Sequence, residues 1–379
     1  MRQDAIAALA TKKLRRAHAV REEAPMAERR KVVVRFNFHY DPAMAERLAR
    51  EPDIELRTCD LAGPEERARA DLAEAHAYQI SSAKDELPRQ WFATAELLER
   101  CPRLLCVSAV GAGYDTVDVA ACTRAGVLVV NQSGANARAV AEHTLGLMLD
   151  LAKRIAENDR RLRRDRGFSR EDLMGREIGG KTLGLVGIGH IGTRVAGLAR
   201  AFGMTVLAHD PYLTEEEIAR RGAASAAMDE LLARSDVVSL HCPRDEATLR
   251  MMDAAAFGRM KPGAVFVTTA RGGIHDEAAL LDALRSGHLG GAGLDVWDQE
   301  PPPLDHPLLG LENVVATYHT AGVTREARRN MALYSAEQVV GVLKGGRPPR
   351  LVNPEAWPAY ARRFEAVMGA RAQAESLDD

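Results

Sequence analysis

Three polar side chains in the C-terminal half of the sequence come just after runs of apolar residues. Arg271 lies in TTARGG, Glu300 in LDVWDQEPP and His319 at the end of VVATYH. An arginine can bind a carboxylate through paired hydrogen bonds, a histidine can transfer a proton near neutral pH, and an adjacent carboxylate favours the protonated histidine. Together they could hold a small anion and protonate an oxygen on it. Taken singly, they can also be a turn residue, a solvated loop acid and a polar strand end.

A glycine-rich motif, GIGHIG, follows the apolar run TLGLV and begins a helical pattern. In this context Gly187 permits a tight turn, Gly189 lets backbone amides approach a pyrophosphate, and Gly192 allows the helix to pack closely on the strand. The helix N-terminus then faces the phosphates. We predict a dinucleotide site that also includes His190 and Ile191. A chance match is the alternative in a chain with 31 glycines.

The next apolar run, MTVLAHD, ends at Asp210, close to the ~20-residue spacing at which an acidic residue accepts hydrogen bonds from the adenosine ribose. A carboxylate at this place repels a 2′-phosphate, so the pattern favours NAD over NADP. Asp210 is also a plausible turn residue before Pro211, and this interpretation is compatible with the first.

Short β-branched runs alternate with helical patterns along most of the chain, which predicts parallel sheets covered by helices. The first series of runs lies at 32–36, 54–60, 77–82, 104–110 and 127–132. The second lies at 182–187, 204–210, 237–243, 264–270, 291–296 and 314–319. A helical pattern at 135–155 joins the two series. After Thr324 a second helical pattern runs to about Leu343, an irregular stretch follows in LVNPEAWPAY, and the last dozen residues are expected to fray.

The composition excludes several classes of partner. The 51 basic residues nearly balance the 53 acidic ones, so no global positive charge favours nucleic acid or an anionic membrane. No apolar stretch approaches the ~20 residues of a membrane span, and no apolar segment follows the basic N-terminus, so we expect a cytoplasmic protein. The five cysteines show no CxxC spacing, which indicates reduced thiols; no metal site is expected.

The order and spacing of the motifs resemble those of the D-2-hydroxyacid dehydrogenase family. GxGxxG is followed by ARG after a later strand, by LDV before EP, and by a terminal histidine. The likeness runs from about Lys31 to the 350s. Two positions depart from the family pattern: Tyr318 stands where Pro commonly precedes the histidine, and Thr268 stands where Asn commonly precedes ARG. Neither departure touches a proposed catalytic group, so they concern the local shape of the pocket.

The resemblance implies hydride transfer between NAD(H) and a small D-2-hydroxy or 2-keto acid. It implies that Arg271 binds the substrate carboxylate and carbonyl, that His319 is the general acid and base, and that Glu300 pairs with His319. Asp295 is implied to hold the nicotinamide carboxamide. Further cofactor contacts are expected from Cys242, Pro243, Thr269 and Ala270. The substrate carboxylate is expected to meet the backbone amides of Val110, Gly111, Ala112 and Gly113.

The fold class expected from these observations is α/β, with two doubly wound parallel-sheet domains: a flavodoxin-like substrate domain and a Rossmann NAD-binding domain. The expected segments are an N-terminal extension at 1–30, the substrate domain at 31–132, the Rossmann domain at 133–325, a C-terminal return to the substrate domain at 326–365 and a tail at 366–379. Substrate would bind between the domains, where closure excludes water. The family resemblance also implies a homodimer. The apolar helix at 135–155 is its candidate interface, unless that helix only fills the domain core.

The far end of the substrate is expected to meet the strand end ISSAKDEL at 80–87. Lys84 in this segment would favour a substrate with a second anionic or strongly polar end, such as a phosphorylated or hydroxylated three-carbon acid. The alternative is a solvated lysine whose charge is balanced by Asp85 and Glu86.

Two other functions remain open on the same scaffold. A regulatory NAD-binding protein would have no need to retain the paired acid formed by Glu300 and His319. A phosphite or formate oxidiser also needs an anion site and a hydride acceptor. Related formate oxidisers resemble one another in having Gln where this chain has Glu300, which speaks against formate and leaves phosphite open.

Overall fold

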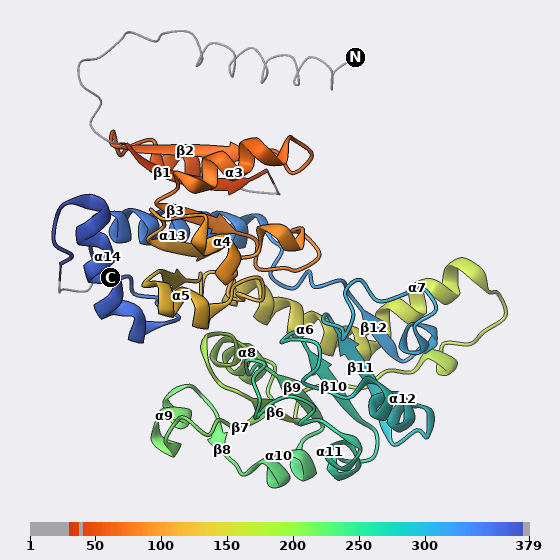
Figure 1. The fold of residues 1–379 in the computed structure, drawn as a ribbon. Helices are drawn as coiled ribbons and strands as arrows, with labels where there is room; N and C mark the ends of the chain where they lie inside the picture. Colours follow the sequence, from red (N-terminus) through yellow and green to blue (C-terminus); the bar gives the residue numbers. More distant parts are fainter. Residues whose placement is uncertain (1–29, 38–40, 374–379) are drawn as a thin grey trace.

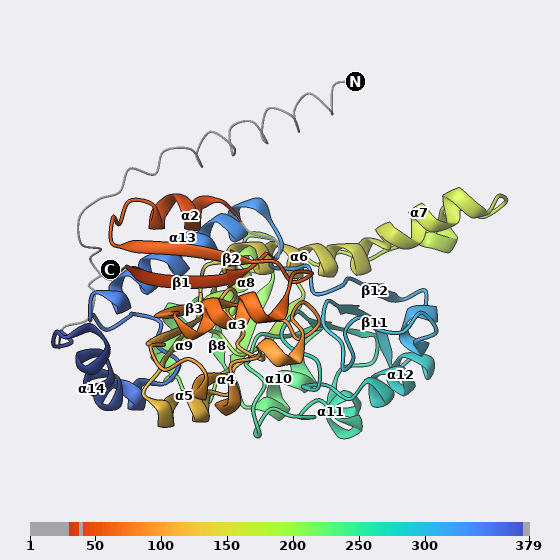
Figure 2. The same ribbon diagram turned by 45° about the horizontal axis from the view of Figure 1, so that its top comes forward.

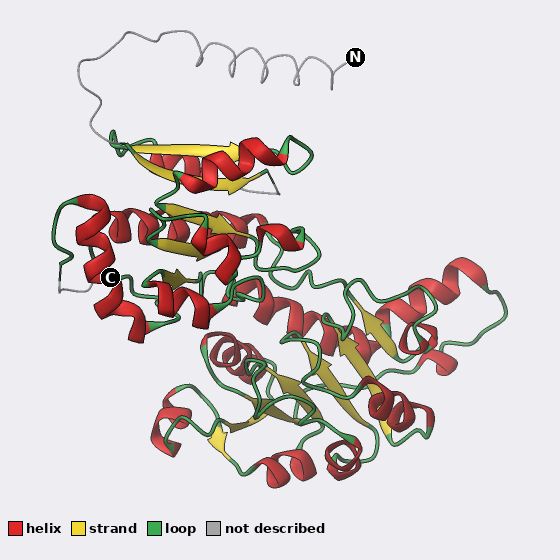
Figure 3. Ribbon diagram, viewed as in Figure 1, coloured by secondary structure: helices red, strands yellow, loops and turns green. Residues whose placement is uncertain are grey.

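The computed structural model describes residues 30–37 and 41–373 and contains two parallel sheets, each covered by helices on both faces (Figure 3). The prediction of an α/β protein with two parallel-sheet units is confirmed. The expected N-terminal extension lies outside the described residues except for Arg30, and so does the end of the expected tail.

The five-stranded sheet has the order β2-β1-β3-β4-β5, with every pair parallel. Its strands are β1 (Lys31–Phe36), β2 (Ile54–Cys59), β3 (Ala77–Ile80), β4 (Cys106–Ala109) and β5 (Leu128–Val130). Successive side chains of β1 point to opposite faces, so Val32 and Val33 enter different buried clusters. Val32 packs in the cluster with α3 (Glu65–Ala73), α4 (Ala95–Glu99) and α5 (Val119–Ala125). Val33 packs in the cluster with α2 (Ala43–Leu48), α13 (Arg325–Leu343) and α14 (Trp357–Met368).

The two C-terminal helices, α13 and α14, therefore lie against the first sheet although the chain reaches them last (Figure 2). We call β1 to β5 with the helices that cover them the five-stranded unit. The expectation of an irregular stretch through LVNPEAWPAY is wrong from Trp357 onward, because α14 begins at that residue. Pro358 lies in the first turn of this helix, where its missing N–H has no intrahelical partner to lose. The helix also runs across the expected boundary at 365/366.

The seven-stranded sheet has the order β12-β11-β10-β9-β6-β7-β8 and is also parallel throughout (Figure 1). Its strands are β6 (Thr182–Val186), β7 (Thr205–His209), β8 (Ala224–Ser225), β9 (Val237–Leu240), β10 (Ala264–Thr268), β11 (Leu289–Leu294) and β12 (Val314–Ala316). One face packs against α6 (Ala137–Lys153), α8 (His190–Ala201) and α9 (Glu215–Arg220). The other packs against α10 (Met228–Arg234), α11 (Ala254–Arg259) and α12 (Glu277–Arg285). We call this sheet with its helices the seven-stranded unit.

The helix expected at 135–155 is present as α6, which ends at Lys153. Arg154 adopts the left-handed conformation with φ of 53°, which ends α6 and precedes α7 (Ile155–Arg164). Leu145, Leu147 and Met148 of α6 are buried against the seven-stranded sheet, so this helix contributes to the core of its own chain. Helix α7 extends away from the body of the molecule (Figure 2). Among the described helices, none is long and apolar enough to cross a membrane.

Candidate active site

The residues with candidate chemistry gather at the carboxyl edge of the seven-stranded sheet. Parallel strands end at the same edge, so the segments that follow β9, β10, β11 and β12 are neighbours there. The strand order reverses between β9 and β6, and the glycine-rich turn follows β6 at this point. Such a reversal opens a crevice beyond the strand ends in which doubly wound sheets bind ligands.

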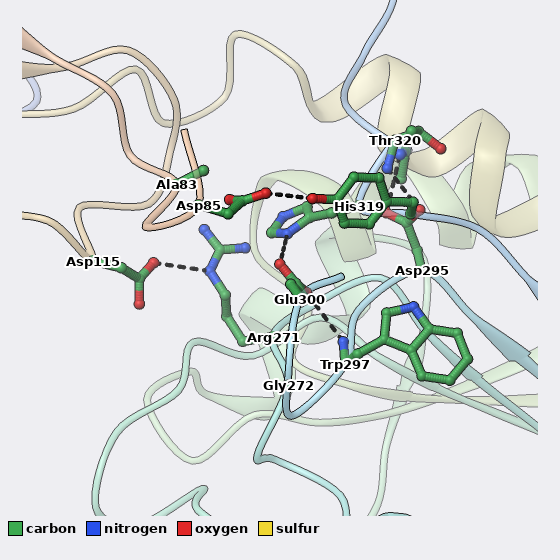
Figure 4. A network of polar contacts seen from close by, with 12 residues as sticks. Ala83, Asp85, Asp115, Arg271, Gly272, Asp295, Trp297, Glu300, His319 and Thr320 are labelled. Carbon is green, nitrogen blue, oxygen red and sulfur yellow. Dashed lines mark hydrogen bonds and ion pairs between the residues drawn. The ribbon is translucent and has the colours of Figure 1, made fainter. Parts of the chain in front are cut away.

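His319 and Glu300 form a direct pair at this edge (Figure 4). The His319 Nδ1 atom lies 2.8 Å from Glu300 Oε2, and the second oxygen, Oε1, accepts a hydrogen bond of 3.1 Å from the Trp297 amide. Glu300 is thus fixed by its own loop while it faces the imidazole. His319 has a left-handed backbone with φ of 46°, and its amide donates to the Asp295 carbonyl over 2.6 Å. Because Nδ1 is occupied, Nε2 is the nitrogen left to exchange a proton with a ligand.

Asp295 holds the loop that carries His319. Its buried carboxylate accepts hydrogen bonds from the Thr317 hydroxyl at 2.6 Å, the Thr320 amide at 2.8 Å and the Ala321 amide at 3.0 Å. These bonds stabilise the turn that keeps His319 in its uncommon backbone conformation. The sequence analysis missed this role, because the LDV motif gives no sign of which later amides the carboxylate will meet. The predicted contact between Asp295 and a nicotinamide stays a prediction.

Arg271 is brought together with the predicted anion loop of the five-stranded unit. A side chain at Gly113 would overlap the Arg271 guanidinium, which shows how closely the loop approaches the arginine. The Val110 amide donates to the Ile80 carbonyl over 2.9 Å and so extends the sheet pairing. The amides of Gly111, Ala112 and Gly113 have no hydrogen-bond acceptor among the described residues. These three amides, rather than that of Val110, are therefore available to an anion.

Two residues that the sequence analysis missed join the units at this site. Asp115, two positions after the anion loop, places one carboxylate oxygen 3.4 Å from Arg271 Nε and the other 2.8 Å from Arg244 Nη2. Arg244 also donates to the Gly272 carbonyl over 3.1 Å. Two features of the sequence could have drawn attention to these residues: Asp115 lies close after the glycines of the anion loop, and Arg244 directly follows HCP. Neither position alone predicts a partner in the other unit.

The glycine-rich turn has the local geometry that a dinucleotide requires. Gly187 has φ of 89°, and a side chain there would meet the Cys242 amide at 2.9 Å. A side chain at Gly192 would overlap the Gly187 carbonyl, so α8 can pack this closely only with glycine. At Gly189 nothing lies within 4 Å of the position of a side chain, and α8 begins at the next residue. The turn therefore leaves open space directly before a helix N-terminus.

Asp210 lies beside this turn, just after β7. One carboxylate oxygen accepts a hydrogen bond of 3.1 Å from the Ile188 amide, and the other accepts one of 3.2 Å from the Tyr212 amide. The Tyr212 bond is the turn interaction expected before Pro211, so both interpretations of Asp210 fit the same geometry. The carboxylate is held at the edge of the nucleotide crevice.

One cavity connects the predicted nucleotide and substrate groups. Among the predicted residues it is lined by Ala112, Gly113, Gly189, His190, Ile191, Cys242, Pro243, Thr269, Ala270 and Arg271. Its walls come from both units. Burial raises the pKa of the Cys242 thiol to about 12, so this cysteine stays protonated and unreactive at neutral pH. Burial lowers the pKa of the neighbouring His241 to about 4, so its imidazole is neutral and leaves the local charge to the two arginines.

Comparison with known proteins identifies the family. The model of the D-isomer specific 2-hydroxyacid dehydrogenase NAD binding domain matches residues 145–321. A glyoxylate reductase of Korarchaeum cryptofilum is 39% identical over 264 residues, which cover 69% of this chain and 80% of that protein. The chain belongs to the D-isomer specific 2-hydroxyacid dehydrogenase family. The crystal structure of a D-lactate dehydrogenase from Aquifex aeolicus, complexed with NAD and lactic acid, has 29% identity and a TM-score of 0.71, covering 83% of this chain and 96% of the other.

Other members of the 2-hydroxyacid dehydrogenase family are longer than this chain. A D-3-phosphoglycerate dehydrogenase of Archaeoglobus fulgidus is 41% identical over 284 residues, which are 75% of this chain but only 53% of that protein. The chain spans about half the length of the D-3-phosphoglycerate dehydrogenases it matches.

At the mouth of this 2-hydroxyacid dehydrogenase site, the structure does not place Lys84 as expected. The Lys84 side chain is exposed, does not line the cavity and has no ion pair among the described residues. Its neighbour Asp85 instead accepts a hydrogen bond from the Tyr318 hydroxyl. The segment after β3 does reach the site, but it presents a carboxylate rather than an ammonium group. The position of Tyr318, where the family commonly has Pro, creates this contact.

Proposed function

We propose that this protein catalyses reversible hydride transfer between NAD(H) and a small D-2-hydroxy acid or 2-keto acid. The observation that carries the proposal is the hydrogen-bonded pair of His319 and Glu300 at the same sheet edge as Arg271 and the glycine-rich turn. Anion binding, proton transfer and dinucleotide binding are thereby combined in one crevice. A protein that only bound the nucleotide would have no use for the proton-transferring pair.

The described residues supply what keto-acid reduction requires. The guanidinium of Arg271 and the amides of Gly111, Ala112 and Gly113 bind the substrate carboxylate and orient the carbonyl oxygen. When bound, NADH supplies the hydride for the carbonyl carbon. His319 gives its Nε2 proton to the carbonyl oxygen and is left neutral, and Glu300 stabilises the protonated form with which each reduction starts. In hydroxy-acid oxidation the neutral His319 takes the hydroxyl proton instead.

We further propose that the enzyme prefers NAD to NADP. The open space at Gly189 and the start of α8 fit a pyrophosphate. The Asp210 carboxylate beside the turn can accept hydrogen bonds from the ribose hydroxyls, and it would repel a 2′-phosphate at the same place. The adenosine end of the cofactor would therefore lie between β7 and the glycine-rich turn.

The domain organisation that we propose follows the two units. Residues 31–132, with the return through α13 and α14 to Met368, form the substrate domain, and the residues between them form the nucleotide domain. Both contribute to the cavity that contains Arg271, which supports substrate binding between them. Domain closure would then bring the loop at 110–113 and the His319 loop onto opposite sides of the substrate.

We also propose a homodimer. Helix α6 is a weaker candidate interface than expected, because its apolar side chains are buried within the chain. The segment formed by α7 and the residues after it is better placed, since Ile155, Leu162 and Met174 are exposed apolar side chains there. Light scattering on the full chain tests this: the expected mass is about twice 41.2 kDa, and a monomer mass would contradict the dimer.

The proposed activity is tested by NADH oxidation with a panel of acids. The panel contains glyoxylate, hydroxypyruvate, pyruvate, a branched-chain keto acid and phosphohydroxypyruvate, with phosphite and NAD as a separate reaction. We expect oxidation of NADH by at least one 2-keto acid. If the protein bound NADH but reduced none of the acids, it would be a regulatory protein on this fold. Reduction of NAD by phosphite alone would identify a different oxidoreductase.

A further inference from the structure

Two acidic residues of the five-stranded unit, Asp115 and Asp85, contact different residues of the seven-stranded unit at the site (Figure 4). Asp115 comes from the loop after β4 and pairs with Arg271 and Arg244. Asp85 comes from the loop after β3 and accepts the hydroxyl proton of Tyr318, the residue directly before His319. Asp115 therefore lies on the side that would bind the substrate carboxylate. Asp85 lies on the side of the proton-transferring histidine.

The charges around Tyr318 are predominantly negative. The hydrogen bond to Asp85 raises the pKa of Tyr318 to about 12, with further contributions from burial and from the carboxylates of Asp85, Glu300 and Glu86. Glu86 is held in the same loop by a hydrogen bond of 2.5 Å from the Ser81 hydroxyl. The phenol is thus neutral over the physiological range and does not change the net negative charge of the carboxylates around it.

The arginines of the site already have a carboxylate partner in Asp115. Arg271 and Arg244 share Asp115, and Arg271 is the group proposed for the substrate carboxylate. Lys84, the cation next to Asp85 in the sequence, is exposed and has no hydrogen bond or ion pair to Tyr318; like Asp85 and Tyr318, it lies outside the lining of the cavity around Arg271. Apart from the proton that His319 transfers, a second anionic group on a substrate would therefore meet an Asp85 carboxylate that has no ion pair among the described residues.

We propose that Asp85, fixed by Tyr318, determines substrate specificity by disfavouring 2-keto acids that carry a second anionic group. The inference rests on the proposed function. With the carboxylate at Arg271 and the carbonyl oxygen at His319, the rest of a small keto acid would lie on the side of Tyr318 and Asp85, because Tyr318 directly precedes the histidine. Unneutralised like charges at a binding site are strongly unfavourable. Acids with no distal group or a neutral hydroxyl are therefore preferred to a phosphate ester. The expectation based on Lys84 gives the opposite order.

The test compares kcat/KM for hydroxypyruvate and phosphohydroxypyruvate, two acids that differ by one phosphoryl group, in the full-length protein with NADH. We expect the parent enzyme to prefer hydroxypyruvate by about tenfold or more. Asp85→Asn keeps an acceptor for the Tyr318 hydroxyl and removes only the charge. This variant should shift the ratio of the two kcat/KM values toward phosphohydroxypyruvate by about tenfold, chiefly through a lower KM for that substrate. Glyoxylate, which has no distal group, should respond much less.

Two further variants separate charge from structure. Glu66→Gln removes an exposed carboxylate on α3 of the same unit and should leave the ratio unchanged. Lys84→Met should leave this kcat/KM ratio unchanged or move it slightly toward hydroxypyruvate. A large fall in kcat/KM for phosphohydroxypyruvate alone would show that Lys84 binds the phosphate. Parent preference for phosphohydroxypyruvate, or equal losses with both substrates in Asp85→Asn, would overturn the assignment of Asp85. Failure of every 2-keto acid to oxidise NADH would instead overturn the proposed function, and this inference with it.

Discussion

The seven-stranded unit holds its site residues just beyond strand ends, whereas the five-stranded unit contacts these residues through two loops. Arg271 and His319 follow β10 and β12, and their places at one sheet edge result from parallel pairing. Asp85 and Asp115 lie in loops after β3 and β4, where the direction of each side chain depends on the local turn. Chemistry at strand ends is therefore fixed by topology, while the loops of the other unit can change specificity without disturbing it.

The strongest test of this division is His319→Ala in the seven-stranded unit. We expect turnover to fall by about 10³-fold or more, because general acid catalysis typically contributes 10²–10⁴-fold. NADH affinity, measured by fluorescence titration, should stay close to that of the parent enzyme. His288→Ala, a change in the same unit but outside the site, should retain normal turnover. Retention of most activity in His319→Ala would assign the proton transfer to another group.

Glu300→Gln probes the second member of the pair. The amide keeps the shape but loses the charge-assisted hydrogen bond to His319, so kcat should fall roughly tenfold. The measurement is kcat for keto-acid reduction with saturating NADH, and an unchanged kcat would show that Glu300 does not support proton transfer by His319.

The same division explains what the sequence alone could predict. Gly187, Gly192 and Asp210 follow strands in a motif whose geometry is largely local, and the structure gives each the surroundings that the motif requires. The carboxylate of Asp295 meets amides and a hydroxyl more than twenty residues later, and Asp115 pairs with arginines of the other unit. Sequence spacing could not predict these contacts. Lys84 and Asp85 are adjacent, and only the turn decides which of them faces Tyr318.

Backbone details were also outside the reach of the apolar pattern. The pattern at 135–155 continues through Arg154, but a single left-handed residue ends α6 there. Strand β8 has two exposed residues, so it carries no apolar run by which it could be recognised. Helix α14 contains Pro358 in its first turn. Proline disrupts the interior of a helix but is tolerated in the first turn, so its presence did not indicate that a helix begins there.

Asp210→Ala should have a more moderate effect, because it would remove the hydrogen bonds proposed between this residue and the cofactor ribose and would leave the reacting groups in place. We expect KM for NAD to rise roughly tenfold, in line with the loss of a charge-assisted bond, and the preference for NAD over NADP to shrink. Initial rates with both cofactors provide the measurement, and Asp229→Ala, an exposed acid elsewhere in the unit, is the matched control. A parent enzyme that already favours NADP would contradict the role given to Asp210.

The smallest effect is expected where the two units meet through Asp115. Its ion pairs with Arg244 and Arg271 are partly exposed, and such pairs usually contribute about 0.2–1 kcal/mol. Asp115→Asn should therefore raise KM for the keto acid about threefold, because Arg271 loses a partner that orients it, and kcat should change little. A double-mutant cycle with Arg244→Gln should show a small coupling that added salt weakens in the parent enzyme. A loss of kcat as large as that of His319→Ala would mean that the five-stranded unit also supplies a catalytic group, and the distinction between the two units would fail.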